Sequence, residues 1–278
     1  MTGHSRLLFL DDSKQNDVPR EGIGGLVAIG GISVAASQAN ELNRRISEEC
    51  SSKFGLPKDV PFKWSPPKKG WLKTNLSDHE RGELIKHVLT TVKEYDPSAI
   101  VALCELGTSP LAGADTHEMS ALIMVMERFH ASIGFADTGI IIIDRPAGDK
   151  SDEESYLTTC ADIAAAGSEY AQFKKLACPI VSMPFSLSRI LQVADLIVSI
   201  TTAHFAGRQA AAEFFPYVLP LLKMVDGRRG GASVKIHPDL KYANLYHWLL
   251  NDDYLKRGSI GVPLPLKDRP YRHSSEGY

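Results

Sequence analysis

The 278-residue chain has few of the features that mark common classes of site. Its four cysteines are widely spaced and form no CxxC pair, so the sequence gives neither a zinc signature nor a disulfide framework. We interpret them as buried small hydrophobic side chains in a reducing compartment. GxxxxGK[ST], HExxH and GxSxG motifs are absent, and no GxGxxG leads from a strand into a helix. These absences argue against nucleotide-binding phosphate loops, zinc proteases and serine hydrolases of those types.

An excess of one charge and a long apolar run are also missing. The formal net charge is −2, so binding to nucleic acid would need a local basic groove rather than the charge of the whole chain. The most apolar segment, residues 190–205, is interrupted by Gln192, Asp195 and His204 and is too short and too polar to span a bilayer. No signal peptide pattern precedes the first apolar run. We therefore expect a cytoplasmic protein with no membrane partner.

The alternation of apolar runs with helix signals predicts an α/β fold. We expect strands over 6–10, 24–34, 99–106, 139–144 and 179–183, with helices over 38–54, 77–95, 117–132 and 151–167 and another after Ser188. An antiparallel start followed by βαβ units predicts a mixed β-sheet with helices on both faces. We expect one domain over 1–258, including a C-terminal helical extension that Pro216 and Pro220 interrupt, and a loose tail over 259–278.

Acidic residues stand where two of these strands are expected to end. Asp11 and Asp12 follow the apolar run 7–10, and Asp144 follows four consecutive isoleucines at 140–143. A carboxylate at the edge of a core is costly unless a cation or a proton compensates it, and open α/β sheets bind ligands at the carboxyl ends of their strands. The alternative is ordinary turn chemistry, with Asp144 paired to Arg145.

Two further polar residues interrupt the apolar segment 190–205. Gln192 and Asp195 are three positions apart and so share one face of a helix. The alternative is that both bond to backbone at the helix edge. Together with the strand-end acids, they favour a cage of hard oxygen ligands for Mg²⁺ or Mn²⁺.

This set of motifs resembles the bacterial and archaeal family known as domain of unknown function 3800. That family carries an N-terminal strand ending in Asp-Glu-Ser, matched here by residues 10–13, and a later helical Gln-x-x-Asp, matched by Gln192–Asp195. An apolar strand ending in Asp before a long helix is matched by Ile143–Arg145. The resemblance spans about residues 6–245 in the order of elements and implies a ribonuclease-H-like fold.

The resemblance also implies a function. Asp11, Asp144 and Asp195 would hold one or two divalent ions and cleave phosphodiester bonds by activating water, with Asp12 or Glu105 as a further carboxylate. Gln192 would orient a water or hold a ligand indirectly. The predicted catalytic and metal-binding residues are therefore Asp11, Asp12, Asp144, Gln192 and Asp195. This chain departs from the family pattern in having Asp12 in place of glutamate, and Phe62 where an acid often precedes the mid-chain lysine.

A Pro-, Lys- and Trp-rich segment over 57–76 is expected to be a loop. Lys63, Trp64, Lys68 and Lys69 combine positive charge with aromatic surface, the combination that holds phosphates and unstacked bases, so they are the predicted substrate-binding residues. The partner would then be DNA or RNA. The alternative is a solvated loop whose tryptophans pack on the core. For the whole protein, the alternatives are a non-catalytic binding or scaffold protein and an enzyme acting on a small phosphorylated molecule.

Overall fold

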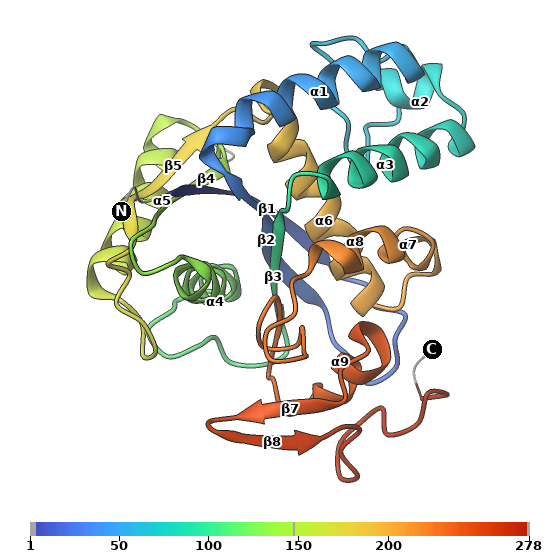
Figure 1. Ribbon diagram of the computed structural model, residues 1–278. Coiled ribbons are helices and arrows are strands. Elements are labelled where there is room, and N and C mark those ends of the chain that lie inside the picture. The colour runs from blue at the N-terminus through green and yellow to red at the C-terminus, as the bar shows by residue number, and fades with distance from the viewer. Residues whose placement is uncertain (1–3, 147, 277–278) are drawn as a thin grey trace. The chain divides into compact units, whose positions relative to one another are not determined.

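The computed structural model describes residues 4–146 and 148–276. Six strands are hydrogen-bonded in the order β5-β4-β1-β2-β3-β6 and are flanked by helices, while β7 and β8 form a separate two-stranded sheet (Figure 1). The connection between β1 and β2 is too short for a parallel crossover, whereas β4 lies parallel to β1, so the sheet is mixed. The α/β class and the mixed sheet with flanking helices are therefore confirmed.

The strands are β1 (Ser5–Gln15), β2 (Leu26–Ala35), β3 (Ser98–Glu105), β4 (Thr138–Asp144), β5 (Leu176–Met183), β6 (Val234–His237), β7 (Tyr254–Arg257) and β8 (Ile260–Pro263). The α-helices are α1 (Ala36–Phe54), α2 (Trp71–Asn75), α3 (Asp78–Lys93), α4 (His117–Ser132), α5 (Lys150–Ala166), α6 (Arg189–Phe205), α7 (Gln209–Ala212), α8 (Phe215–Val218) and α9 (Ala243–Leu250). Two short 3₁₀ turns are η1 (Phe185–Leu187) and η2 (Leu219–Leu221).

Most elements up to α6 coincide with the predicted ones, with three local differences. The first strand runs on to Gln15, so Asp11 and Asp12 lie within β1 rather than after its end. The capping box of α5 uses Asp149 and Asp152, so this helix begins at Lys150, one residue earlier than predicted. The loop over 57–76 contains the five-residue helix α2.

Contacts divide the chain into two compact units. The first comprises Met1–Asp11, Gly31–Pro97 and Phe129–Ile197, and the second comprises Asp12–Gly30, Ser98–Arg128 and Val198–Tyr278. Because β1, β2, α4 and α6 each contribute residues to both, the units do not follow one another along the chain.

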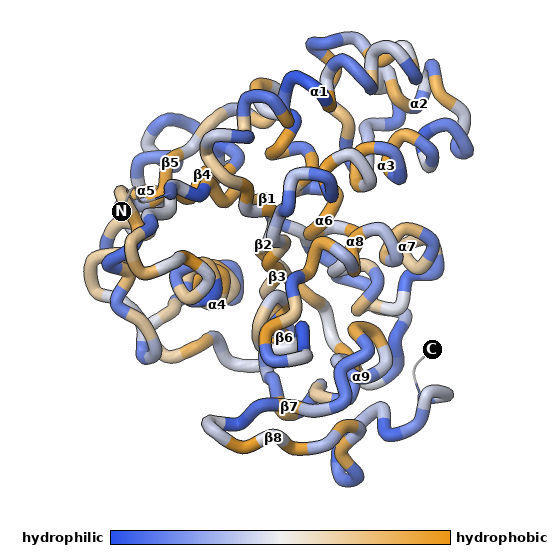
Figure 2. Tube along the Cα trace, viewed as in Figure 1, coloured by the Kyte–Doolittle hydropathy of each residue, from blue (hydrophilic) through white to orange (hydrophobic). Residues whose placement is uncertain are grey.

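The first unit is built around β4, which pairs in parallel with β1 on one side and β5 on the other. Helix α1 buries a single stripe, Leu42, Ile46 and Cys50, whose spacing of four keeps these side chains on one face. It lies beside α3 (Figure 1), and the remaining surface of α1 is mostly hydrophilic (Figure 2). A narrow apolar stripe therefore suffices to dock this helix pair.

Close packing of α6 in the first unit depends on a glycine. A Cβ built on Gly31 of β2 would lie 1.9 Å from the carbonyl oxygen of Phe9 and 2.9 Å from the Cβ of Ala194. Any side chain would separate these groups. Gly31 therefore allows the α6 residue just before Asp195 to lie close to strands β1 and β2.

The second unit contains the parallel pair β3–β6, the antiparallel hairpin β7–β8 and helix α9. All eight residues of β3 are buried. Within the tail predicted to be loose, residues 259–276 contain β8 and the buried Tyr271. The carbonyl of Tyr271 accepts a hydrogen bond of 2.8 Å from Trp248 Nε1 of α9, so a side-chain anchor that carries no local sequence signal holds this part of the chain.

Hydrophobic residues are concentrated on the central strands and on α6 (Figure 2). In residues 4–146 and 148–276, every helix falls short of the length and hydropathy that crossing a membrane requires.

Candidate functional site

Two of the predicted carboxylates lie where the pairing of two neighbouring strands stops: Asp144 ends β4, and Asp11 lies within the longer strand β1. The parallel register of β1 and β4 pairs Leu10 with Ile143, and Asp11 and Asp144 are the next residue on each strand. Paired residues of neighbouring strands point to the same face, and the strands lie about 4.8 Å apart. Both aspartates are half-buried, so their backbone positions suit a shared oxygen site open to solvent.

Backbone donors hold the Asp144 side chain through one of its oxygens. Oδ1 accepts hydrogen bonds of 2.8 Å from the N–H of Arg145 and 2.9 Å from the N–H of Phe185 in η1. The guanidinium of Arg145 is instead 3.4 Å from Glu153. The strand-end carboxylate is thus oriented by main chain, rather than paired with the neighbouring arginine side chain as the alternative supposed.

Asp195 lies on α6 and is nearly buried, with 9% of its surface exposed. Its Oδ2 accepts a hydrogen bond of 2.8 Å from the backbone N–H of Trp64. This carboxylate therefore connects α6 to the Lys- and Trp-rich loop, in agreement with the alternative that it bonds to backbone. The same contact brings two predicted site residues together.

Gln192 has no exposed surface, and its amide is used within the protein. Its Oε1 accepts from the N–H of Phe62 at 3.2 Å and from Nη1 of Arg189 at 2.8 Å, and its Nε2 donates to the carbonyl of Phe185 at 3.3 Å. A side chain engaged in this way does not reach a substrate. We therefore assign Gln192 a positioning role, since it joins the η1 turn that holds Asp144 to the loop that holds Asp195.

Arg189 completes this network and was missed by the sequence reasoning. It is 4% exposed, and its guanidinium donates to the carbonyls of Val60 at 2.8 Å and Lys58 at 2.9 Å. Burial lowers the pKa of Arg189 from its ordinary value. Its spacing offered a signal. Arg189 lies three positions before Gln192, as Gln192 does before Asp195, so neighbouring members of this series lie next to each other on the helix surface.

The Lys- and Trp-rich loop surrounds a pocket of about 480 Å³. Its lining residues are Asp59, Val60, Pro61, Lys63, Ser65, Pro66, Pro67, Gly70, Trp71 and Leu72. Lys63 places its ammonium 4.1 Å from the ring centre of Phe185, Trp64 is half-buried, and Lys68 and Lys69 are exposed. Of the four predicted substrate-binding residues, only Lys63 lines this pocket.

Two remaining acids of the prediction belong to the second unit. Asp12 is exposed. Glu105 is 5% exposed and is engaged by Lys241 at 3.0 Å and by the N–H of Gly24 at 2.9 Å. Burial acts to raise the pKa of Glu105, but hydrogen bonds from Tyr242, Lys241 and Gly24 outweigh it and lower that pKa. Glu105 therefore stabilises the second unit as a structural ion pair.

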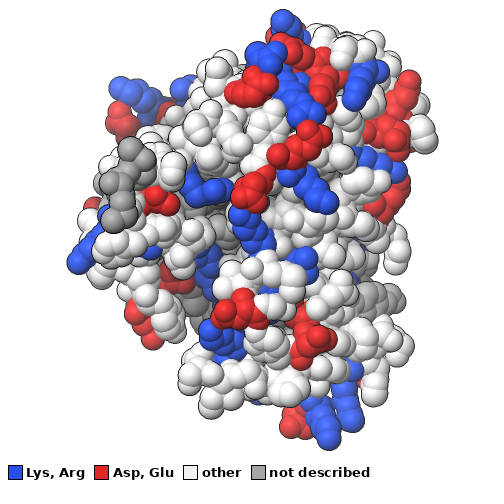
Figure 3. All heavy atoms as spheres, viewed as in Figure 1, with Lys and Arg blue, Asp and Glu red and all other residues white. Residues whose placement is uncertain are grey.

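Charges of both signs are interspersed on the face of the molecule seen in Figure 3, as expected for a net charge of −2. Within the part of the chain that the structure describes, no group of three or more His, Cys, Asp or Glu side chains is arranged to hold a metal ion. Comparison with family models, with curated proteins and with solved structures gave no match.

Proposed function

We propose that this protein is a divalent-metal-dependent phosphodiesterase that acts on nucleic acid, with Asp11 and Asp144 as its first pair of carboxylates. The observation that carries the proposal is the β1–β4 register, in which these two acids directly follow the pair Leu10–Ile143. Adjacent carboxylates at a half-exposed strand edge fit Mg²⁺ or Mn²⁺, which take oxygen ligands. The resemblance to the domain of unknown function 3800 family, and the ribonuclease-H-like element order it implies, support the same conclusion.

The residues around this pair have separable tasks in the proposed reaction. Asp11 and Asp144 would hold the divalent ion, which would supply an activated water and positive charge for the leaving oxygen of a phosphodiester. Asp144 keeps one oxygen on the backbone of Arg145 and Phe185, which fixes the direction of the other. Asp195 holds the loop at Trp64, and Lys63 supplies positive charge for a phosphate.

Mn²⁺ binding measured by calorimetry tests the carboxylate pair directly. We expect micromolar binding by the wild type and its loss in Asp144→Asn and in Asp11→Asn, because each substitution removes a charged oxygen ligand. Asp137→Asn is the matched control, since Asp137 immediately precedes β4 at its opposite end. Binding that persists in both site variants, or that is lost equally in the control, contradicts the assignment.

Cleavage assays then test the substrate. Labelled single- and double-stranded DNA and RNA are incubated with Mn²⁺ or with a chelator, and products are resolved by size. We expect metal-dependent cleavage that Asp144→Ala abolishes. Gln192→Ala should retain the fold and reduce metal affinity or activity by about 10–100-fold, the effect typical of groups that orient ligands. Cleavage by Asp144→Ala at the wild-type rate excludes the proposed mechanism.

A non-catalytic binding protein is the second candidate. It is favoured by the use of Gln192 and Asp195 to hold loop backbone. This candidate predicts nucleic-acid binding that neither Mn²⁺ nor the Asp144→Asn substitution alters. A gel-shift titration with and without chelator separates the two functions.

A further inference from the structure

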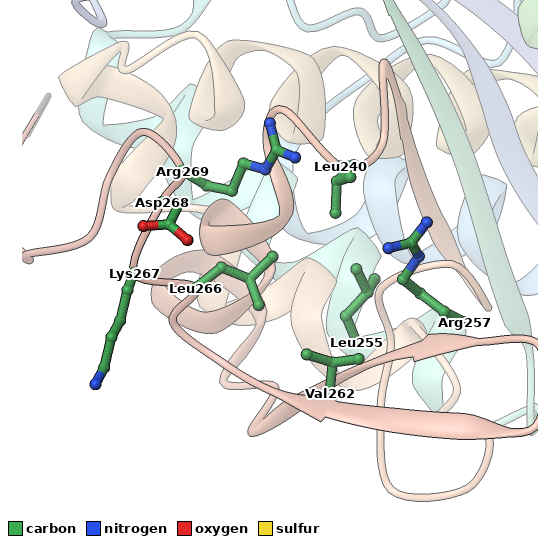
Figure 4. Close-up of a pocket in the computed structure, with 8 residues that line it drawn as sticks. All are labelled: Leu240, Leu255, Arg257, Val262, Leu266, Lys267, Asp268 and Arg269. Atoms are coloured by element: carbon green, nitrogen blue, oxygen red, sulfur yellow. The ribbon is translucent and has the colours of Figure 1, made fainter.

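The second unit contains a pocket that the proposed function does not use. It has a volume of about 210 Å³ and lies beside the β7–β8 hairpin and the chain that follows it (Figure 4). The lining residues are Leu240, Leu255, Arg257, Val262, Leu266, Lys267, Asp268 and Arg269. Four are aliphatic, three are basic and one is acidic, so the pocket combines an apolar wall with net positive charge.

The aliphatic wall is only partly covered. Leu255 is 3% exposed, whereas Leu240, Val262 and Leu266 are each half-buried. Leu255 and Val262 are register partners across the β7–β8 hairpin, so the hairpin presents them side by side. Contact with a small apolar group would remove the exposed part of this surface from water, which is favourable.

The opposite wall is fixed in place by Asn244 of α9, which has no exposed surface. Its Oδ1 accepts from the N–H of Leu266 at 2.6 Å, and its Nδ2 donates to the carbonyls of Leu266 at 3.0 Å and Pro270 at 2.9 Å. One buried amide thus fixes the backbone on both sides of Arg269. A pocket with preformed walls loses less entropy when it binds a ligand.

The two arginines that line the pocket are exposed to solvent, unlike the half-buried Arg229 of this unit. Arg229 donates to the carbonyls of Leu222 and Leu250. Among the described residues, the guanidinium groups of Arg257 and Arg269 have no hydrogen-bond or ion-pair partner. Figure 4 shows them on either side of Leu240, while Lys267 points away from the pocket. Two unpaired guanidiniums beside an apolar wall form a receptor for an anionic head group.

We propose that this pocket binds a small organic anion with a phosphate or carboxylate head and an apolar body. Arg257 and Arg269 would hold the head, because planar guanidiniums match the oxygens of both groups. Leu240, Val262 and Leu266 would contact the body. The inference is independent of the proposed nuclease function, since it uses none of the carboxylates of the first unit.

Binding of three probes to the full chain tests the proposal. Phenyl phosphate, benzoate and benzyl alcohol share an aromatic body and differ in the head, and each is titrated by calorimetry and by chemical-shift mapping. We expect saturable binding of one or both anions with a Kd below about 1 mM, corresponding to about −4 kcal/mol, and at least tenfold weaker binding of benzyl alcohol. A preference between the anions identifies the head group.

Substitutions identify the residues responsible. We expect Arg257→Ala and Arg269→Ala each to weaken anion binding about tenfold or more, since a charge-assisted hydrogen bond is lost. Arg269→Lys keeps the positive charge but not the planar guanidinium with its paired N–H donors, so it should give an intermediate loss of anion affinity. Lys267→Ala is the matched control and should change binding less than about twofold, as a charge directed into solvent does.

Four results would overturn the proposal. The first three are equal affinity for benzyl alcohol, an equal loss in the Lys267→Ala control, and no saturable binding of either anion by wild type. The fourth is a set of chemical-shift changes that lie outside the hairpin and residues 264–270. Thermal unfolding of each variant confirms that the exposed substitutions leave the fold intact.

Discussion

The acids of the two units are satisfied in different ways. In the second unit, Glu105 pairs with Lys241, and Asp252 uses both oxygens, accepting from the N–H groups of Arg229 at 2.9 Å and Gly230 at 2.6 Å. In the first unit, half-buried Asp144 accepts hydrogen bonds on Oδ1 from two backbone N–H groups, those of Arg145 and Phe185. Backbone N–H groups that bind one carboxylate oxygen orient the side chain, but they do not neutralise its charge as a cationic side chain would.

This difference shows how burial and charge separate structural acids from candidate ligands. Asp252 has no exposed surface, and burial raises its pKa despite the two backbone donors. Asp144 is half-buried at a strand edge, where water or an ion can reach it. Glu105 and Asp252 are therefore structural acids, whereas Asp11 and Asp144 are the pair for which we propose a cation.

The largest expected effect is on the buried arginine of the first unit. Arg189→Ala should reduce the free energy of unfolding by about 3–5 kcal/mol, because it removes a network of hydrogen bonds and leaves buried carbonyls without donors. Urea unfolding followed by circular dichroism measures this change. The control is Arg145→Ala, whose side chain is 56% exposed and whose effect should stay within about 0.5 kcal/mol. Equal effects would show that the network around Gln192 adds no stability.

A smaller effect distinguishes the acids of the two units. Asp252→Ala should cost about 2–4 kcal/mol, since two backbone donors lose their acceptor away from water. Asp144→Ala should cost about 1 kcal/mol or less, because water can replace the half-buried carboxylate. The same urea experiment compares them. A loss for Asp144→Ala as large as that for Asp252→Ala would indicate that Asp144 is a structural acid.

The smallest effect is a pH dependence in the second unit. The folded-state pKa of Glu105 lies below its ordinary value of 4.5, so its stabilisation is fully present above that value and is lost as pH falls through the lower folded pKa. Glu105→Gln should therefore cost about 1–2 kcal/mol at neutral pH, and the difference from wild type should shrink below pH 4.5. Exposed Glu169→Gln serves as the control. A difference that does not change with pH would exclude the ion pair with Lys241 as its source.

Much of the secondary structure could be predicted because its signals are local. The four isoleucines at 140–143 fall within β4, and α3, predicted over 77–95, begins after a capping box formed by Ser77 and Glu80. The elements after α6 were largely missed. Strand β6 has only four residues, and the hairpin β7–β8 has two four-residue strands, so neither is long enough to establish a periodic pattern.

For the candidate site too, local features could be predicted from the sequence and long-range contacts could not. Spacing alone predicted that Gln192 and Asp195 share a helix face. The apolar runs predicted strands, and therefore that the acids following those runs lie near strand ends. Their partners could not be predicted, because the loop backbone at Phe62 and Trp64 is about 130 residues away along the chain. The role of Arg189 was hidden for the same reason, since its acceptors are carbonyls of that loop.

The sequence by itself determined the α/β class, most elements through α6 and the positions of the acids within them, because periodicity, capping and turn chemistry act over a few residues. Tertiary structure alone decided which acids share a strand edge, which are neutralised by a partner and which guanidiniums remain unpaired. Those outcomes depend on register and burial, and both are set by contacts between segments that are distant along the chain.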